Sequence, residues 1–328
     1  EPGNHSTIPE KEEVASLLKA EGLDWDQPYS MDGNWQANGS ERTFLNKRQN
    51  YFREEVKAVE ARIESNQQAV VERLAQSGPL PLDFGLNMDL VPYANTQWVW
   101  GQVAGKIVRV GTFDELKAGG FETGSEPTGL DKSWQRAAEL ALTMSPDVGT
   151  STNISPAMDE KVYGPEVDVN LEAEYGWNQR GRPELYVRSS PWTRHIRFEI
   201  AEANCMSAAG SFGQMRRFSG VPLLPLMTVY DFFIKRALDQ LYYNVYWRSS
   251  FIFVGTPSGV SLSPEGAQHS WKSDIQFPSL ITWEPAFAKE MEWVLADATR
   301  RHLEEDQKDR EGVLIRASTR GLPQKEFL

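Results

Sequence analysis

The stretch that decides the fold of this chain is His195–Asn204, HIRFEIAEAN. Its first half is typical of a strand, and the Glu- and Ala-rich residues that follow are typical of the start of a helix. Glu202 occupies the junction. A carboxylate at this place is stabilised by the helix dipole and the free backbone amides by about 0.3–1 kcal/mol, so a capping role alone would account for it. The alternative hypothesis is that Glu202 takes part in acid–base catalysis.

The alternation of strand and helix extends on both sides of this stretch, from Asp131 onward. The expected strands are 146–152 (a short strand and loop), His195–Ile200, Val221–Thr228, Phe251–Gly255, Leu280–Trp283 and Gly312–Ser318. The expected helices are Asp131–Met144, Glu202–Arg217, Asp231–Trp247 and Pro285–His302. Strands separated by helices are typical of βαβ units, so residues 129–328 are predicted to form an α/β domain with a mostly parallel sheet flanked by helices.

Residues 1–128 have a different character. We expect a short helix at Lys11–Ala20 and a long helix at Ser40–Ser77. The apolar residues of the long helix fall mostly three, four or seven apart, and they are Leu45, Phe52, Val56, Val59, Ile63, Val70, Val71 and Leu74. Such a helix suits a linker lying across a domain or a partner, and equally an ordinary surface helix. Leu80–Thr128 is poorly patterned, with one strand expected at Lys106–Val110.

Composition excludes several classes of function. The net charge of −12 argues against nucleic acid and anionic membranes as main partners, because both select basic surfaces. No run approaches the roughly 18 consecutive apolar residues of a membrane span. Cys205 is the single cysteine, so an intrachain disulfide is excluded and a reducing compartment is expected. We predict a cytoplasmic protein, and a mitochondrial matrix would satisfy the same composition.

Polar and aromatic side chains gather at the expected carboxyl ends of the strands, where ligands of parallel sheets bind. Glu202, Tyr230, Thr256 and Glu284 all have this position. No GxGxxG or Walker sequence is present, which gives no support to a nucleotide phosphate loop. No Cys/His spacing predicts a metal site, and Cys205 lies in a helix that we expect to be buried rather than reactive.

The aromatic run after Tyr230 has two interpretations. Phe232 and Phe233 could stack on a flat heterocycle or pack in the core. On a helix of period 3.6 only one of them can point fully inward, which leaves one core residue and one site residue. Arg236 and Asp239 lie three apart and are expected to pair with each other.

His269 is a further candidate, in the Gly-, Ser- and Pro-rich stretch Pro264–Asp274, PEGAQHSWKSD. A histidine in a loop is more often an exposed polar residue than a catalyst. The chain has only four histidines, however, and a group that titrates near neutral pH could bind a substrate carbonyl or carboxylate and move protons.

Six pieces of the chain occur in the order and at the spacing of a known family. They are SPDVGTSTN (145–153), RHIRFEIAEAN (194–204), LLPLMTVYDFFIKRALDQL (223–241), TPSGVSLSPEGAQHSWKSD (256–274), LITWEPAFAKE (280–290) and VLIRASTR (313–320). Together they resemble the pyrimidine-binding middle domain of thiamine-diphosphate enzymes, in the group of transketolase and the homodimeric pyruvate dehydrogenase decarboxylating component. The resemblance implies thiamine diphosphate and magnesium as cofactors.

The resemblance also assigns roles. Glu202 matches the glutamate that activates the cofactor by sharing a proton with a ring nitrogen of its aminopyrimidine. One of Phe232 and Phe233 matches the aromatic residue that stacks on the pyrimidine, with Tyr230 beside it. His269 matches the histidine of the family's active-site loop. Residues 1–128 then correspond to the tail of a preceding domain, an inter-domain helical linker and the irregular region.

Departures from the family pattern are informative. Glu199 stands where the family usually has glycine, and Ser270 stands where transketolases have glutamine. The GDG…N motif that holds magnesium and diphosphate is absent from this sequence. The chain also starts without methionine and stops soon after VLIRASTR, so we expect a piece of a longer polypeptide or a split subunit. A second copy, or a different chain carrying the diphosphate-binding domain, would have to complete the site.

Three functions follow as hypotheses. The first is part of a 2-oxo acid (pyruvate-like) dehydrogenase decarboxylating component, which would pass an acyl group to a lipoyl acyltransferase. The second is ketol transfer between sugar phosphates, which requires several Arg or His at the mouth of the site. The third is a non-catalytic scaffold or regulatory chain with the same fold. We favour the 2-oxo acid, because the chain has few histidines and lacks the transketolase loop pattern.

Overall fold

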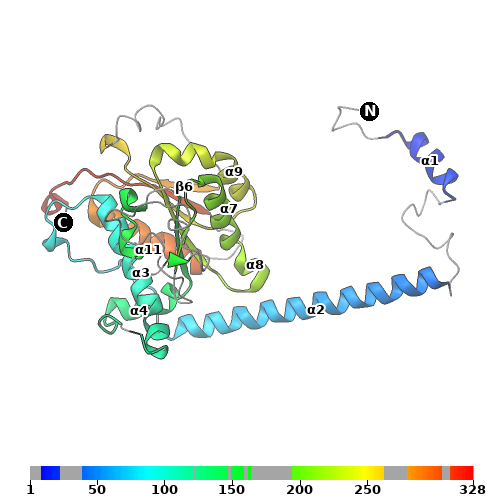
Figure 1. Cartoon of the computed structure of the whole chain (residues 1–328), viewed down its shortest axis with the longest axis horizontal. Helices are drawn as coiled ribbons and strands as arrows, with labels where there is room; N and C mark the ends of the chain where they lie inside the picture. Colours follow the sequence, from blue (N-terminus) through cyan, green and yellow to red (C-terminus); the bar gives the residue numbers. More distant parts are fainter. Residues whose placement is uncertain are drawn as a thin grey trace, which may run out of the picture. The chain divides into compact units, whose positions relative to one another are not determined.

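A computed structural model of the protein describes residues 9–22, 39–121, 123–146, 149–158, 162–163, 194–261, 279–304 and 311–327 (Figure 1). The chain divides into two compact units, Glu1–Arg62 and Ile63–Leu328. The first unit contains α1 (Lys11–Ala20) and the beginning of α2 (Ser40–Ala75), which confirms both helices expected from the sequence. No helix among the described residues has the length and apolarity to cross a membrane.

The second unit is built on a parallel sheet, which confirms the predicted α/β fold. The seven strands in the described residues follow the order β2-β3-β1-β4-β5-β7-β6, and every neighbouring pair is parallel. The strands are β1 (Ala141–Ser145), β2 (Val162–Tyr163), β3 (His195–Arg197), β4 (Leu224–Val229), β5 (Ile252–Gly255), β6 (Leu280–Trp283) and β7 (Gly312–Arg316). Their carboxyl ends therefore share one edge.

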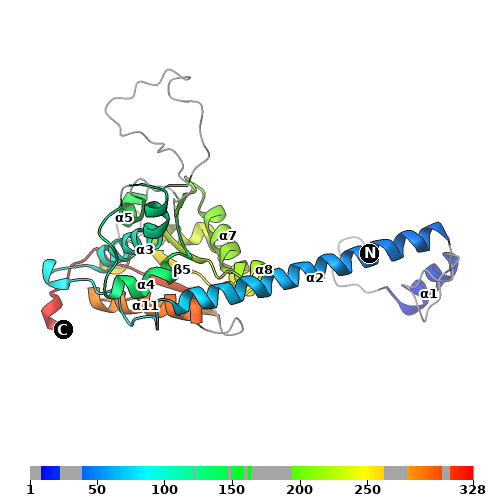
Figure 2. The ribbon, with the colours of Figure 1, turned by 90° about the horizontal axis from the view of Figure 1, so that it is seen from below.

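Helices cover both faces of the sheet (Figures 1 and 2). One face carries α3 (Thr96–Ala118), α4 (Leu130–Ala138) and α11 (Ala288–Glu304), and the other carries α7 (Glu202–Gly213) and α9 (Leu238–Tyr246). The remaining short elements are α5 (Ser155–Met158), α8 (Met215–Ser219) and the 3-10 helices η1 (Met88–Leu90), η2 (Gly149–Thr152), η3 (Asp231–Ala237), η4 (Gly259–Ser261) and η5 (Gln324–Glu326).

The sheet has a hydrophobic core on each face, and strand β5 contributes to both. Ile252 and Val254 pack with α3, α4 and α11, whereas Phe253, and Phe251 just before the strand, pack on the side of α7 and α9. Successive side chains of a strand alternate between faces, so a strand covered by helices on both sides must be apolar throughout. This explains why the buried strands are continuous apolar runs.

The strand expected at Lys106–Val110 is wrong, because these residues form the middle of α3. Ile107, Val108 and Val110 are all buried against neighbouring elements, and this tertiary burial outweighs the preference of branched residues for strands. Gly111 lets α3 approach α4 closely, since a Cβ there would lie 2.3 Å from the Ala138 carbonyl oxygen. Helix α3 belongs to the compact unit Ile63–Leu328, together with the sheet.

Several element boundaries also differ from expectation. The helix expected at Asp131–Met144 ends at Ala138, and its last residues belong to strand β1. Residues 149–152 form a 3-10 helix where a strand and loop were expected. The helix expected at Glu202–Arg217 is broken at Gln214 into α7 and α8. The helix expected at Asp231–Trp247 begins as the 3-10 helix η3 before α9.

Two histidines are buried in the packed unit as neutral groups. His302 lies 2.8 Å through Nε2 from the Leu223 carbonyl and 2.8 Å through Nδ1 from Ser250 Oγ. The carbonyl can only accept, so Nε2 carries the proton and Nδ1 accepts from the hydroxyl. Burial lowers the pKa of His302 to about 4, and burial lowers the pKa of His195 to about 3.

We predict that the free energy of unfolding falls as the pH drops below about 6.5, the pKa of an unfolded histidine. In the window from there to about 4, the unfolded chain takes up a proton on His302 that the folded chain excludes. The loss is about 1.4 kcal/mol per pH unit for this residue. Urea unfolding at pH 7, 6 and 5 should show His302→Gln with a slope against pH that is shallower by this amount. Equal slopes would contradict the prediction.

Candidate functional site

Glu202 is the first residue of α7, at the carboxyl end of β3, as the sequence predicted. Its side chain is 5% exposed, which is unusual for a carboxylate. The turn before it contains Glu199 in the left-handed region, at φ 52°, and the Ala201 amide donates to the Glu199 carbonyl at 2.8 Å. The Glu199 side chain is 71% exposed, so its charge does not fill the space around Glu202.

Arg236 holds the buried carboxylate. Its Nη1 lies 2.9 Å from Glu202 Oε1, in a charge-assisted hydrogen bond. The pairing of Arg236 with Asp239 expected from the sequence is therefore wrong. The two residues straddle the junction of η3 and α9, and the guanidinium reaches across to α7 instead. Within the described part of the chain the other carboxylate oxygen, Oε2, accepts no hydrogen bond, so it can accept one from a ligand.

Three aromatic rings lie next to this ion pair. Tyr230 stacks on Phe232 with 5.4 Å between ring centroids, and Phe233 meets Phe232 edge-on at 4.2 Å. The Arg236 guanidinium lies over the Phe233 ring, 3.7 Å from its centroid, so the ion pair and the rings form one cluster. Phe233 packs against the core on the α7 side, and all three rings are half-buried.

A second chain of charges continues along the same edge. Asp231 is buried at 3% exposure, and its Oδ2 lies 3.7 Å from Arg316 Nη1 at the end of β7. Arg316 Nε also lies 3.9 Å from Glu284 Oε1 at the end of β6. Of these three residues, only Glu284 was predicted from the sequence. Asp231 follows β4 by two residues and Arg316 is the last residue of β7, so both stand at the carboxyl ends of strands. This position could have identified them as candidates.

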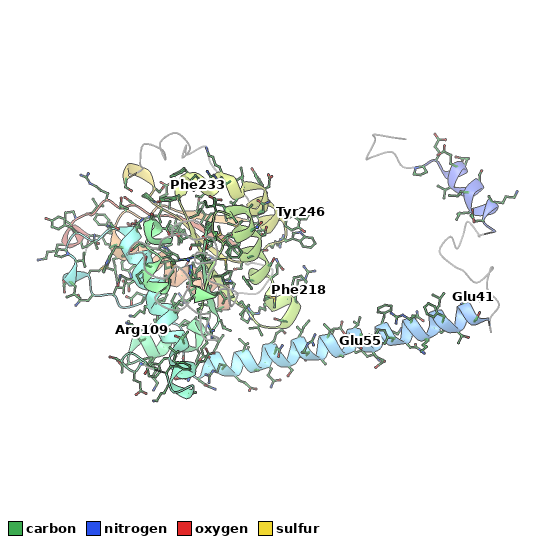
Figure 3. All side chains as sticks on the ribbon, viewed as in Figure 1. Glu41, Glu55, Arg109, Phe218, Phe233 and Tyr246 are labelled. Carbon is green, nitrogen blue, oxygen red and sulfur yellow. The ribbon has the colours of Figure 1, made fainter. Side chains whose placement is uncertain are left out.

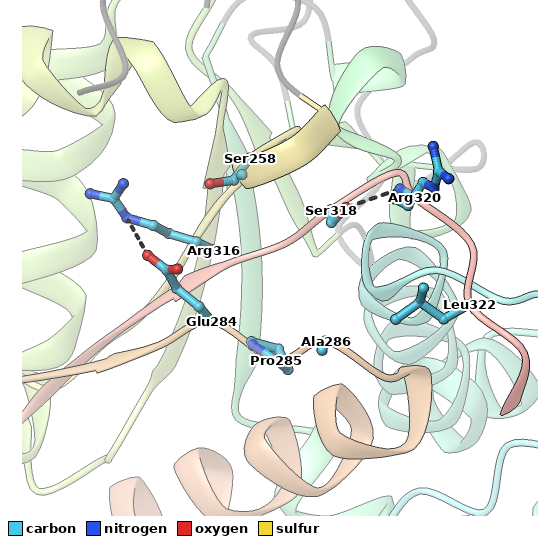
Figure 4. A pocket seen from close by; sticks show the side chains of 9 residues that line it. Ser258, Glu284, Pro285, Ala286, Arg316, Ser318, Arg320 and Leu322 are labelled. Carbon is cyan, nitrogen blue, oxygen red and sulfur yellow. Dashed lines mark hydrogen bonds and ion pairs between the residues drawn. The ribbon is translucent and has the colours of Figure 1, made fainter. Parts of the chain in front are cut away.

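A cavity of about 190 Å³ opens beside Arg316, over the ends of β5, β6 and β7 (Figure 4). Its lining is Ser258, Gly259, Glu284, Pro285, Ala286, Arg316, Ser318, Arg320 and Leu322. Figure 4 shows Glu284 turned toward Arg316, whereas Arg320 extends away from that pair. The cavity therefore offers the Arg320 guanidinium and the hydroxyls of Ser258 and Ser318. The Glu284 carboxylate beside them is already paired with Arg316.

The other expected candidates do not add to this cluster. His269 lies outside the described residues. Burial raises the pKa of the Cys205 thiol well above its usual range, and the nearby Glu202 carboxylate adds to this, so the thiol is held protonated. Among the described residues there is no group of three His, Cys, Asp or Glu side chains that could hold a metal ion.

No protein-family model matches the sequence, and no curated protein matches it either. Solved structures of transketolase from Pichia stipitis are similar in fold. They include a variant with fructose 6-phosphate (TM-score 0.55, 13% identity), another variant (0.54, 12%) and a complex with sedoheptulose 7-phosphate (0.52, 12%).

Each of these alignments covers 96% of this chain and 39% of the transketolase chain. The chain thus spans about two fifths of the length of the proteins that it resembles. The predicted transketolase-like fold is confirmed, and at this level of identity the likeness concerns the fold alone.

We predict that Arg236→Met destabilises the protein by about 1–3 kcal/mol, because it leaves the Glu202 carboxylate buried without its partner. Urea unfolding at pH 7 measures the change. Lys235→Met, the same substitution at the exposed neighbouring residue, should stay within about 0.5 kcal/mol of the parent. The double variant Glu202→Gln/Arg236→Met should be more stable than Arg236→Met alone. Additive effects of the two substitutions would show that the pair is not coupled.

Proposed function

We propose that this chain is the pyrimidine-binding part of a thiamine-diphosphate-dependent enzyme that acts on a 2-oxo acid, with Glu202 as the residue that activates the cofactor. One observation carries the proposal. A carboxylate that is 5% exposed lies at the carboxyl edge of a parallel sheet, held through one oxygen by Arg236 and bordered by three half-buried rings. The transketolase-like fold supports it.

The residues present fit an aminopyrimidine ring. Glu202 Oε2 can bond a protonated ring nitrogen, and the half-buried rings of Tyr230 and Phe232 offer flat apolar surface for stacking. They do not fit the metal, since the described residues contain no cluster of metal ligands. We infer that the magnesium and diphosphate groups are held by another domain, from a second copy or from a different chain. A homo-oligomer or hetero-oligomer is therefore part of the proposal.

When bound, thiamine diphosphate supplies a carbon nucleophile for the substrate carbonyl and accepts the electrons of the broken carbon–carbon bond. Glu202 holds and exchanges the proton at the pyrimidine nitrogen, which sets the basicity of the neighbouring amino group. Arg236 fixes the direction of the carboxylate, so that one oxygen faces the ring. The aromatic cluster excludes water on the side of this chain.

The charges beside the cluster support an anionic substrate. Arg316 is balanced by Asp231 and Glu284, whereas Arg320 contributes a further positive charge at the cavity. The carboxylate of a 2-oxo acid matches one such charge, and a lipoyl acyltransferase would be the acceptor of the acyl group. Transfer of a ketol unit between sugar phosphates is the second candidate, favoured by the similar structures that hold sugar phosphates. With one buried cysteine, we place the protein in the cytoplasm or a mitochondrial matrix.

The test is 2-oxo acid decarboxylation by the protein purified with its co-purifying chains, in the presence of thiamine diphosphate and Mg²⁺, with an artificial electron acceptor. Glu202→Gln should lower the rate by at least about 100-fold, because it removes the acid–base group. Glu199→Gln makes the same change at an exposed neighbouring carboxylate, and it should leave the rate within about threefold.

The other outcomes separate the three hypotheses. Turnover of a ketose phosphate with an aldose phosphate, without turnover of 2-oxo acids, would establish the ketol-transfer function. Equal rates for the parent and Glu202→Gln would refute both enzymatic roles of this residue. Failure to bind thiamine diphosphate in the presence of every co-purifying chain would favour the non-catalytic scaffold.

A further inference from the structure

One short element, η3 (Asp231–Ala237), carries Phe232, Phe233 and Arg236 beside Glu202, and Phe233 is labelled in Figure 3. Its length of 7 residues is unusual for a 3-10 helix. The hydrogen bonds of such a helix are poorly aligned, and runs beyond about four residues are uncommon. Contacts with the rest of the fold must therefore hold η3, and the side chains that it presents to the candidate site, in place.

The buried side of η3 repeats at every third residue, as expected for a helix with three residues per turn. Asp231, Ile234 and Ala237 are 3%, 1% and 0% exposed. Phe233 and Arg236 share a second side, with the guanidinium over the ring. Ile234 and Ala237 belong to the hydrophobic core on the side of α7 and α9. The anchor of the first turn is of a different kind, since it is a carboxylate.

The Asp231 carboxylate lies against the ends of β5 and β7. A Cβ on Gly255, the last residue of β5, would lie 2.9 Å from Asp231 Oδ1, so the glycine makes room for the carboxylate. Arg316, the last residue of β7, places its Nη1 3.7 Å from Asp231 Oδ2. A charge that is almost excluded from water requires an opposite charge close by. Since β5 lies between β4 and β7, the start of η3 depends on a residue two strands away in the sheet.

We propose that Arg316 is a positioning residue for the candidate site, and that it acts through Asp231 on η3. By neutralising the buried carboxylate, Arg316 fixes the first turn of η3. That turn in turn fixes the aromatic rings and the Arg236 guanidinium, which holds the Glu202 carboxylate. This inference rests on the proposed function, in which Glu202 and the rings receive an aminopyrimidine.

A direct contact of Arg316 with a ligand is the alternative role. Arg316 lines the cavity over the ends of β5, β6 and β7, where its Nε lies 3.9 Å from Glu284 Oε1 (Figure 4). Asp231 is not part of the lining of this cavity. The two roles therefore differ in what they require. Positioning requires both Asp231 and Arg316, whereas a direct contact requires the guanidinium alone.

Hydrogen exchange followed by mass spectrometry measures the hold on η3 in the absence of cofactor, in the peptide that contains residues 230–238. Asp231→Asn and Arg316→Met should each speed its exchange about tenfold, because each removes one charge of the buried pair. Arg316→Lys keeps the charge and should recover most of the protection. Arg320→Met makes the same substitution at an arginine that extends away from the Arg316–Glu284 pair, and it should leave exchange of η3 within about twofold (Figure 4).

Titration calorimetry with thiamine diphosphate, in the presence of Mg²⁺ and the co-purifying chains, measures the consequence for the site. The dissociation constant should rise about tenfold in Asp231→Asn and in Arg316→Met, because the rings are less well fixed before the ligand arrives. The double variant should match either single variant within about threefold, since the pair acts as one unit. The KM for the 2-oxo acid in Asp231→Asn should stay within about threefold of the parent, because the effect falls on the cofactor.

Each other outcome overturns the proposal in a recognisable way. Unchanged exchange of η3 in both variants would show that the pair does not hold this element, and faster exchange in every peptide would show a general loss of stability. Weaker cofactor binding in Arg316→Met, with Asp231→Asn equal to the parent, would assign the direct contact instead. Normal binding by all variants would refute the positioning role alone. A parent protein that binds no thiamine diphosphate would refute the proposed function, and the positioning role with it.

Discussion

The constraint on which the site depends is the parallel pairing of β1 with both β3 and β4. A parallel neighbour can be reached only through a crossover connection, and here α7 and α8 make that crossover from β3 over β1 to β4. The residue that follows β3 and the residues that follow β4 must then lie at the same edge of the sheet, because the two strands run in the same direction. Glu202 starts the crossover, and Arg236 follows the return strand in η3, which is why two residues on different elements form one ion pair.

At the carboxyl edge of the sheet, each buried carboxylate is paired with an arginine. Glu202 is paired with Arg236, and Asp231 with Arg316, so that neither buried acid lies in the interior without a positive charge close by. The two arginines differ in exposure. The Arg316 side chain is 12% exposed and is held between two acids, whereas the Arg236 side chain is 51% exposed. Arg316 is thus part of the framework of the edge, whereas Arg236 reaches the buried Glu202 carboxylate from a position that is open to solvent.

The sequence predicted the parts of the fold that are governed by local pattern. Strand β5 and strand β7 are apolar runs bounded by polar residues, and Glu202 sits where a strand pattern changes to a helix pattern. The prediction of a strand within α3 was wrong because Ile107, Val108 and Val110 are branched residues that are buried in the packing of α3 against α4, α5 and the sheet. A helix covered on most sides loses the polar stripe by which its period is recognised. The predicted pairing of Arg236 with Asp239 was wrong for a related reason. The contact of Arg236 in η3 with Glu202 in α7 is set by the topology of the sheet and not by spacing along the chain.

The geometry also explains why a chain with this fold would need a second surface. Glu202 is almost fully buried, yet the rings beside it are only half-buried. A proton exchanged between a carboxylate and a heterocycle is best controlled where water is excluded, because the local dielectric then strengthens each polar contact. Under the proposed function, this chain would supply the acid–base group and one wall of such a site. The other wall would then come from another domain or chain, and the half-buried rings are the surface on which that wall would close.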